Sequence, residues 1–318
     1  MDKNARHPIG PSTPPSPPQP VRPIVTRPRP ARPARPYRPE AASAEAVGTL
    51  PNLVIIGAMK CGTTSLHEYL DCHPEVFMSR RKETNFFVAE HNWAKGLAWY
   101  RSHFPEKKRV IGESSPNYTR FPLYAGVPER MHRVLPGAKL LYCVRDPIKR
   151  MVSHYVHSYS LGREHRPFAE AMLERKNNRY LVSSLYHFQL EQYRRFYDPS
   201  QIKVVVLEEL YRDPLGTLQE VFAFLGVDPT YEDSRFTKAS ATMPAAATRR
   251  RSPLKNWMVA RKLRGVYWLE RNAPWVFGPP IKTPQVTPAL RAELTAMLQE
   301  DVQALRALTG LSLGAWSL

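Results

Sequence analysis

Residues 53–65 read Leu-Val-Ile-Ile-Gly-Ala-Met-Lys-Cys-Gly-Thr-Thr-Ser, and this stretch constrains the fold more than any other part of the chain. Four apolar, mostly β-branched residues run into Gly57, which predicts a buried strand that ends in a turn. A short loop with a second glycine follows, and three hydroxyl residues begin a predicted helix at 63–71. Backbone N–H groups and the dipole at a helix N-terminus favour an anion. The sequence therefore predicts a strand, a phosphate-binding loop and a helix in direct succession.

The order of residues in this loop differs from that of nucleotide-hydrolysing loops. The common P-loop has Gly, four residues, Gly, then Lys and Ser or Thr. Gly57 and Gly62 keep this spacing, but Thr63 occupies the lysine position and the lysine is Lys60, inside the loop. No hydroxyl residue follows a lysine to bind Mg²⁺. We therefore expect phosphate binding without a metal ion, with Lys60 free to reach the group that is transferred.

A second anion-binding pair is expected around Arg145, which stands at the carboxyl end of a predicted strand. An Asp-Pro pair at 146–147 predicts the start of a helix, with Asp as N-cap. Ser153 then lies about two turns into that helix. A guanidinium offers a planar fork to oxyanions, so Arg145 and Ser153 together can bind one phosphate. Lys149 and Arg150, between them, are expected to be solvated charges.

The order of predicted elements defines the fold class. Buried or apolar stretches predict strands at 53–57, 76–78, 110–113, 139–144 and 202–207. Helices are predicted at 63–71, 91–104, 122–135, from 147 onward, 167–175, 181–197, 214–225 and 288–309. This alternation predicts an α/β, P-loop-type three-layer fold with a central parallel sheet flanked by helices. Ligands bind at the carboxyl ends of such strands, where segments 57–65, 82–87 and 145–153 are expected to meet.

Both phosphate-binding motifs resemble those of sulfotransferases that use 3′-phosphoadenylyl sulfate (PAPS), of a bacterial type similar to the heparan sulfate sulfotransferase domain. The resemblance covers roughly residues 51–312. It implies that Arg145 and Ser153 bind the 3′-phosphate and that Lys60 neutralises charge on the leaving group. The implied contacts to the 5′-phosphosulfate are Lys60, Cys61, Gly62, Thr63, Thr64 and Ser65. No metal is required by this chemistry.

Residues 80–87, Arg-Arg-Lys-Glu-Thr-Asn-Phe-Phe, carry the candidate general base. An apolar wall raises the pKa of a carboxylate toward useful values, whereas nearby lysines lower it. The pattern Lys-Glu-x-x-Phe-Phe resembles the segment that supplies the base in heparan sulfate sulfotransferases, which implies that Glu83 takes the acceptor proton. Lys82 is then a positioning or cofactor contact; the alternative is a solvated Lys–Glu pair. The rival bases are His67, His73, His154 and His157, for which surface or packing roles are expected because none lies in a matching segment.

The acceptor is left open by the sequence. Residues 112–118 resemble the acceptor-side segment of the family, but Ser114 stands where many heparan sulfate enzymes have lysine, which does not favour a sulfated glycan. A sugar, a lipid headgroup, a phenol or a secondary metabolite with a hydroxyl or amine remains open. Within 236–256, four basic residues either close over the nucleotide or form a solvated loop: Arg249, Arg250, Arg251 and Lys255.

Residues 1–50 differ from the rest of the chain. They hold 13 of the 32 prolines and almost no aromatic residues, too little apolar surface to offset the entropy of ordering. We expect a disordered, Pro/Arg-rich arm, followed by a sulfotransferase domain at 51–318. The formal net charge is +18, of which the arm contributes +5 (eight basic minus three acidic residues), leaving +13 for the domain. The arm is a candidate for contact with an anionic surface; nucleic acid is not the expected partner.

The features that the sequence lacks bear on where the protein is located and on which other functions stay open. The arm has no continuous apolar h-region, so no signal peptide is expected, and no run of about 18 apolar residues predicts a transmembrane helix. Cys61, Cys72 and Cys143 lack zinc-site spacing and fit a reduced, cytoplasmic protein. One alternative is a P-loop kinase, which needs a lysine after Gly62. The other is a non-catalytic, basic nucleic-acid-binding protein, which predicts salt-dependent binding without turnover.

Overall fold

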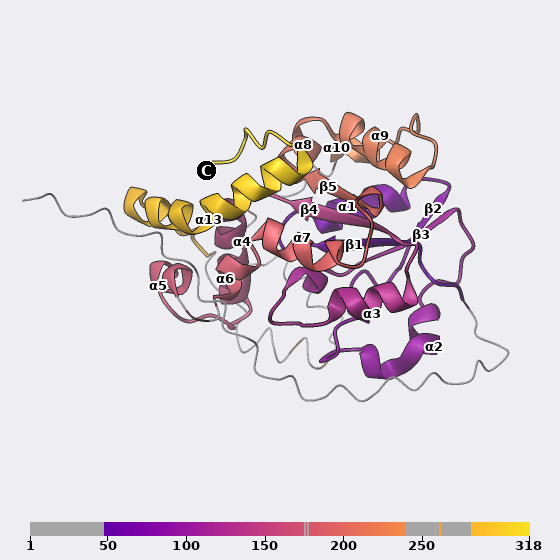
Figure 1. Cartoon of the computed structure of the whole chain (residues 1–318), viewed down its shortest axis with the longest axis horizontal. Coiled ribbons are helices and arrows are strands. Elements are labelled where there is room, and N and C mark those ends of the chain that lie inside the picture. The colour runs from indigo at the N-terminus through magenta and orange to yellow at the C-terminus, as the bar shows by residue number, and fades with distance from the viewer. Residues whose placement is uncertain (1–47, 175, 177, 239–257, 259–260, 262–280) are drawn as a thin grey trace, which may run out of the picture.

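The computed structural model describes residues 48–174, 176, 178–238, 258, 261 and 281–318. Five strands form one sheet: β1 (Leu53–Gly57), β2 (Val76–Met78), β3 (Val110–Ser114), β4 (Lys139–Val144) and β5 (Ile202–Val206). Their order is β2-β3-β1-β4-β5, and every neighbouring pair is parallel (Figure 1). The predicted central parallel sheet is confirmed.

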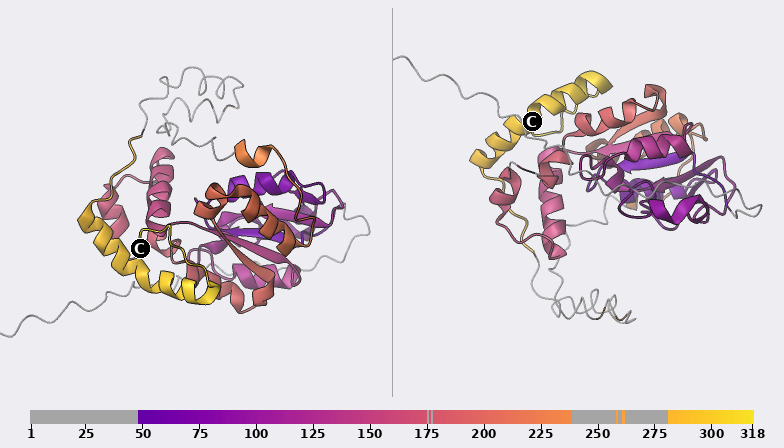
Figure 2. Two further views of the ribbon diagram at one scale, coloured as in Figure 1. Left: turned by 90° about the horizontal axis from the view of Figure 1, so that it is seen from above. Right: turned by 60° about the horizontal axis from the view of Figure 1, so that its bottom comes forward.

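Helices cover both faces of this sheet. They are α1 (Thr63–Asp71), α2 (Gly96–Arg101), α3 (Val127–Val134), α4 (Pro147–Ser160), α5 (Phe168–Leu173), α6 (Arg179–Val182), α7 (Tyr186–Arg194), α8 (Leu207–Arg212), α9 (Pro214–Leu225), α10 (Arg235–Lys238) and α13 (Pro288–Thr309). Short 3₁₀ turns are η1 (Trp93–Lys95), η2 (Pro116–Thr119) and η3 (Pro199–Gln201). In Figure 2, left, α1 and α9 lie on one face of the sheet and α3, α7 and α13 on the other, which confirms the three-layer arrangement.

Two of the three inner strands, β1 and β4, show why apolar runs in the sequence predicted strands. All five residues of β1 are buried, and in β4 every residue after Lys139 is buried. A parallel strand covered on both faces reads as a continuous apolar run. The two strands pair from Leu53↔Lys139 to Gly57↔Tyr142, with an irregular register between Ile55 and Gly57, where β1 passes into the loop.

Several predicted helices are shorter than expected because glycines or turns divide them. The stretch 122–135 is helical only as α3, since Gly126 takes a left-handed φ of 70° at its N-cap. The stretch 91–104 becomes η1 and α2, which meet at Gly96 with a φ of 77°. The stretch 181–197 is divided into α6 and α7. Helix α8 follows β5 directly and was not predicted.

A second apolar cluster joins the C-terminal helix to α4. Leu294 and Leu298 of α13 belong to the same buried cluster as Met151 of α4 and Leu181 of α6. This cluster holds α4 against the body of the domain. Residues 1–47 lie outside the described residues, and so does nearly all of the predicted basic loop. In the part of the chain that the structure describes, no helix has both the length and the apolar character needed to cross a membrane.

Candidate functional site

The loop after β1 leaves the first turn of α1 without a side-chain cap. Gly62 is the N-cap, with a left-handed φ of 81°, and it has no side chain to cap the first amides of the helix. The left-handed backbone favours glycine here, and a Cβ on Gly62 would lie 2.3 Å from Leu207 Cδ1, so the Leu207 side chain would have to move. Thr63 is buried, Ser65 is half-buried and Thr64 is exposed. The amide groups of this turn can therefore receive an anion.

Lys60 lies in this loop with a left-handed φ of 71°, which is uncommon for a residue with a side chain. Its side chain is partly buried. Burial lowers the pKa of the Lys60 ammonium, and the nearby positive charge of Arg145 lowers it further. The loop after β1 and the residue after β4 therefore share one electropositive environment, which a bound anion would stabilise.

Glu83 lies close to the start of α1, because the adjacent residue Lys82 contacts both Thr63 and Glu83. Lys82 Nζ lies 3.4 Å from Thr63 Oγ1 and 3.5 Å from Glu83 Oε1. The side chain of Glu83 is 51% exposed, so its carboxylate is open to an acceptor from solvent, whereas Lys82 is mostly covered. The expected meeting of segments 57–65 and 82–87 at the carboxyl ends of the strands is observed.

The second predicted pair lies at the start of α4. Asp146 caps the helix by accepting a hydrogen bond of 2.9 Å from the Lys149 amide, and Pro147 begins it. Tyr186 donates its hydroxyl to the carbonyl oxygen of Arg145 at 2.8 Å, which fixes the backbone at the end of β4. Arg145 and Ser153 are both half-buried, the serine about two turns into the helix as expected.

Arg150 is fully buried, so the expectation that it is solvated was wrong. It lies on the inward face of α4, one turn from His154, and its guanidinium donates to Ser184 Oγ and to the carbonyl oxygens of Tyr180 and Met59. Burial lowers its pKa. Lys149, on the outward face, is exposed as expected. Arg150 therefore connects the phosphate loop to α4 and α6.

Three of the four candidate histidines have buried side chains. Burial and the charge of Lys82 lower the pKa of His67 to about 4, and burial with nearby arginines holds the pKa of His154 well below its ordinary value. His73 packs against the rings of Phe222 and Tyr231. These positions agree with packing roles. His157 is half-buried on α4.

The last residues of the chain contact the start of α4, a relationship that the sequence did not indicate. Ser317 N donates to Asp146 Oδ2 at 2.8 Å, and Trp316 Nε1 donates to Glu208 Oε2 at 3.2 Å. The other oxygen of Glu208 accepts from the Asp146 amide at 3.0 Å. The Trp316 ring also packs on Tyr186, the residue that holds Arg145.

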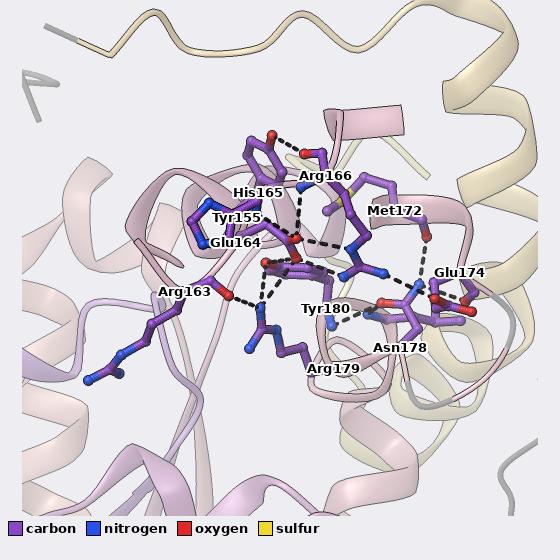
Figure 3. Close-up of polar contacts among 11 residues, drawn as sticks. Tyr155, Arg163, Glu164, His165, Arg166, Met172, Glu174, Asn178, Arg179 and Tyr180 are labelled. Atoms are coloured by element: carbon purple, nitrogen blue, oxygen red, sulfur yellow. Dashed lines mark hydrogen bonds and ion pairs between the residues drawn. The ribbon is translucent and has the colours of Figure 1, made fainter. Parts of the chain in front are cut away.

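The segment between α4 and α6 is organised around the buried carboxylate of Glu164 (Figure 3). Arg166 Nη2 pairs with it at 2.7 Å and Arg179 Nη2 at 3.2 Å, while the Tyr180 hydroxyl donates at 2.9 Å. Tyr155 of α4 donates to the carbonyl oxygen of Arg166. These contacts hold the far end of α4, the helix that carries Ser153. They were not predicted, because the partners belong to different elements.

The sulfur of Cys61 lies 3.4 Å from the hydroxyl of Tyr186, the residue that also contacts the Arg145 carbonyl oxygen. Cys61 is buried, and burial raises the pKa of its thiol to about 11. Among the described residues, no group of three or more His, Cys, Asp or Glu side chains is arranged to bind a metal. Four basic residues of the late loop lie outside the described residues: Arg249, Arg250, Arg251 and Lys255.

Comparisons with known proteins agree with this fold. The sulfotransferase domain family matches residues 50–264. Heparan sulfate glucosamine 3-O-sulfotransferase 5 of Mus musculus is 32% identical over 198 residues, covering 58% of this chain and 56% of that protein. Bifunctional heparan sulfate N-deacetylase/N-sulfotransferase 3 of Homo sapiens is 29% identical over 209 residues, covering 58% and 23%. The crystal structure of a sulfotransferase from Alicyclobacillus acidocaldarius has a TM-score of 0.62 at 27% identity, covering 85% of this chain and all of that one.

The fold and the loop after β1 thus define an α/β protein with a P-loop-type architecture. The chain belongs to the sulfotransferase domain family. It spans about half the length, or less, of these two curated relatives.

Proposed function

We propose that this enzyme transfers the sulfuryl group of PAPS to a hydroxyl or amine of a carbohydrate, a lipid or a small metabolite. The observation that carries the proposal is the position of Lys82, which contacts Thr63 at the phosphate-binding helix and Glu83 at the candidate base. Donor-binding and base-bearing segments are thereby joined at one end of the sheet. The names of the two curated relatives include an O-sulfotransferase and an N-sulfotransferase, which supports both kinds of acceptor atom.

Two groups of residues would hold the donor. The first-turn amides of α1 and the hydroxyls of residues 63–65 bind the 5′-phosphosulfate, with Lys60, Cys61 and Gly62 in the same loop. Arg145 and Ser153 bind the 3′-phosphate. The uncapped helix end and the paired positive charges of Lys60 and Arg145 both favour an anionic ligand, which supports this assignment.

The transfer itself needs a base and a cation. Glu83 accepts the proton of the acceptor hydroxyl or amine as the acceptor atom bonds to sulfur. The bond between sulfur and the bridging oxygen of PAPS breaks, and 3′-phosphoadenosine 5′-phosphate (PAP) leaves. The Lys60 ammonium neutralises the charge that develops on that oxygen. As in phosphoryl transfer, catalysis then consists mainly of positioning and electrostatic stabilisation.

Calorimetry with the full chain tests the donor assignment. PAP is expected to bind and ATP is not. Incubation of the enzyme with PAPS and sugars, lipids, phenols and amines, followed by mass spectrometry, should reveal one class of product heavier by SO₃. Binding of ATP without binding of PAP would contradict the proposal and favour a P-loop kinase.

The role of the basic arm stays a prediction, because the arm lies mainly outside the described residues. A cytoplasmic location also stays a prediction. We propose that residues 1–50 contact an anionic surface. Vesicles containing anionic phospholipid should retain the full chain more strongly than a chain that begins at residue 51. Equal retention would contradict this role, and strong salt-dependent binding to DNA would indicate the nucleic-acid alternative.

A further inference from the structure

Glu113, near the end of β3, is a completely buried carboxylate surrounded by hydroxyl groups. Its Oε2 atom accepts from Thr84 Oγ1 and Ser115 Oγ, both at 2.6 Å. Its Oε1 atom accepts from the hydroxyls of Tyr118 at 2.8 Å and Tyr100 at 2.9 Å. No described lysine, arginine or histidine forms an ion pair with it. Burial raises the pKa of Glu113, and these four hydrogen bonds oppose that effect.

Three of these hydroxyls accept, in turn, from consecutive backbone amides of the loop that carries Glu83. Asn85 N donates to Ser115 Oγ at 3.0 Å, and longer contacts of 3.4 and 3.5 Å run from Phe86 N to Thr84 Oγ1 and from Phe87 N to Tyr118 OH. A hydroxyl that donates its one proton to Glu113 keeps its lone pairs for these amides. Thr84 Oγ1 and Tyr118 OH also lie 3.2 Å apart, so the two hydroxyls contact each other as well as the carboxylate.

The other side of the loop is held as well. Ser114 N donates to the carbonyl oxygen of Lys82 at 3.2 Å, and Asn92 Nδ2 donates to that of Thr84 at 2.6 Å. Glu83, between these two residues, has an exposed side chain on a backbone that is fastened on both sides. Asn85 takes a left-handed φ of 47°, a conformation that such anchoring stabilises.

We propose that Glu113 is a positioning residue for sulfuryl transfer, holding the Glu83 loop through Ser115, Thr84 and Tyr118. This role rests on the proposed function, because it matters for catalysis only if Glu83 is the base. A glutamine in its place offers one acceptor oxygen and adds two donors, so it cannot accept all four hydroxyls. The loop would then lose its fixed geometry, and a base displaced by about 1 Å loses much of its effect.

The test compares variants that remove different bonds to Glu113. Ser115→Ala and Thr84→Val break the relay to the loop, whereas Tyr100→Phe, the matched control, removes an equally buried hydroxyl that none of these loop amides contacts. Glu113→Gln alters the whole relay; if it fails to fold, the Ser115 and Thr84 variants still decide. Each is examined by hydrogen exchange at residues 84–88, by calorimetry with PAP, and by transfer kinetics with an acceptor identified by the mass spectrometry experiment described above.

In the Ser115 and Thr84 variants we expect exchange at residues 84–88 to be about tenfold faster and kcat to fall about tenfold or more, with PAP affinity unchanged within about twofold. Tyr100→Phe should lower the melting temperature but leave kcat near the wild-type value. Wild-type exchange and kcat in Ser115→Ala, or an equal loss of kcat in Tyr100→Phe, would overturn the proposal. If the wild-type enzyme neither binds PAP nor transfers sulfate, the proposed function fails, and with it the catalytic role of Glu113, whatever the exchange rates.

Discussion

Arg150 Nη1 donates a hydrogen bond of 3.4 Å to the carbonyl oxygen of Met59, which lies 91 residues earlier in the chain. Met59 lies in the loop between β1 and α1, so the buried guanidinium of Arg150 on α4 holds the backbone of that loop. The same side chain binds Ser184 and the carbonyl oxygen of Tyr180.

Arg150→Ala is expected to destabilise the protein by about 3 kcal/mol, because it leaves a cavity and carbonyl oxygens without their donor. Urea denaturation of the full chain measures this. Lys149→Ala, on the exposed face of the same helix, should change the free energy of unfolding by less than about 0.5 kcal/mol. Similar effects of the two substitutions would mean that the contacts of Arg150 contribute little.

Lys60→Ala should lower the transfer rate about 100-fold or more, since the charge that develops on the leaving oxygen loses its cation. Single-turnover kinetics with PAPS measures this, and calorimetry should show that PAP still binds. Lys149→Ala, which removes an exposed lysine, serves as the control. Full activity of Lys60→Ala would exclude its role in the leaving step.

Glu83→Gln keeps the size of the side chain but cannot accept the acceptor proton. We expect PAP binding to be retained and kcat to fall at least about 100-fold. Glu90→Gln, an exposed position a few residues on, should retain the wild-type rate. A wild-type rate in Glu83→Gln would show that another group is the base.

Arg145→Ala should weaken binding of PAP far more than binding of adenosine 5′-phosphosulfate, because only the former carries a 3′-phosphate. Loss of a charge-assisted hydrogen bond predicts a decrease in PAP affinity of about tenfold or more. Paired titrations of both nucleotides measure the difference. An equal decrease for the two nucleotides would assign Arg145 to another part of the donor.

Glu164 is expected to make stability depend on pH. Hydrogen bonds from Arg166 hold the pKa of its carboxyl well below the ordinary value of 4.5. Because the pKa is lower in the folded state, the ionised carboxylate stabilises the protein at pH values above 4.5. This contribution is lost as the pH falls from 4.5 toward the folded-state pKa. Thermal unfolding of Glu164→Gln should show a loss of about 2 kcal/mol at pH 7 that shrinks toward pH 3.

Glu174→Gln is the control for this experiment. Glu174 pairs with Arg166 at 3.0 Å, but its side chain is 41% exposed, so solvent screens the interaction. Its effect should be small at every pH. A loss in Glu164→Gln that stays the same from pH 7 to pH 3 would mean that packing, rather than charge, explains it.

The sequence predicted those parts of the fold whose residues carry a local signal. The apolar runs of β1 and β4 are buried on both faces, and Asp146 with Pro147 marks a helix start without reference to the rest of the chain. The convergence of Lys60, Glu83 and Arg145 followed from a general property of parallel sheets. These predictions needed no knowledge of tertiary contacts.

The sequence could not predict contacts whose partners are distant. Arg150 was expected at the surface because a charge is usually solvated; its acceptors come from the phosphate loop and α6, which only the fold brings together. The relay from Glu113 was missed for the same reason, since it needs hydroxyls from several separate segments. The breaks at Gly96 and Gly126 depend on backbone angles that helical periodicity does not reveal.

The contact between Ser317 and Asp146 has a practical consequence for purification and labelling. Any peptide fused after Leu318 begins directly beside the hydrogen bond that ties the chain's final residues to the first turn of α4, next to Arg145. A bulky fusion partner there would disturb the proposed nucleotide pocket, and weak activity of such a preparation would reflect the tag. Affinity handles and fluorescent reporters are therefore best kept away from Trp316 and Ser317.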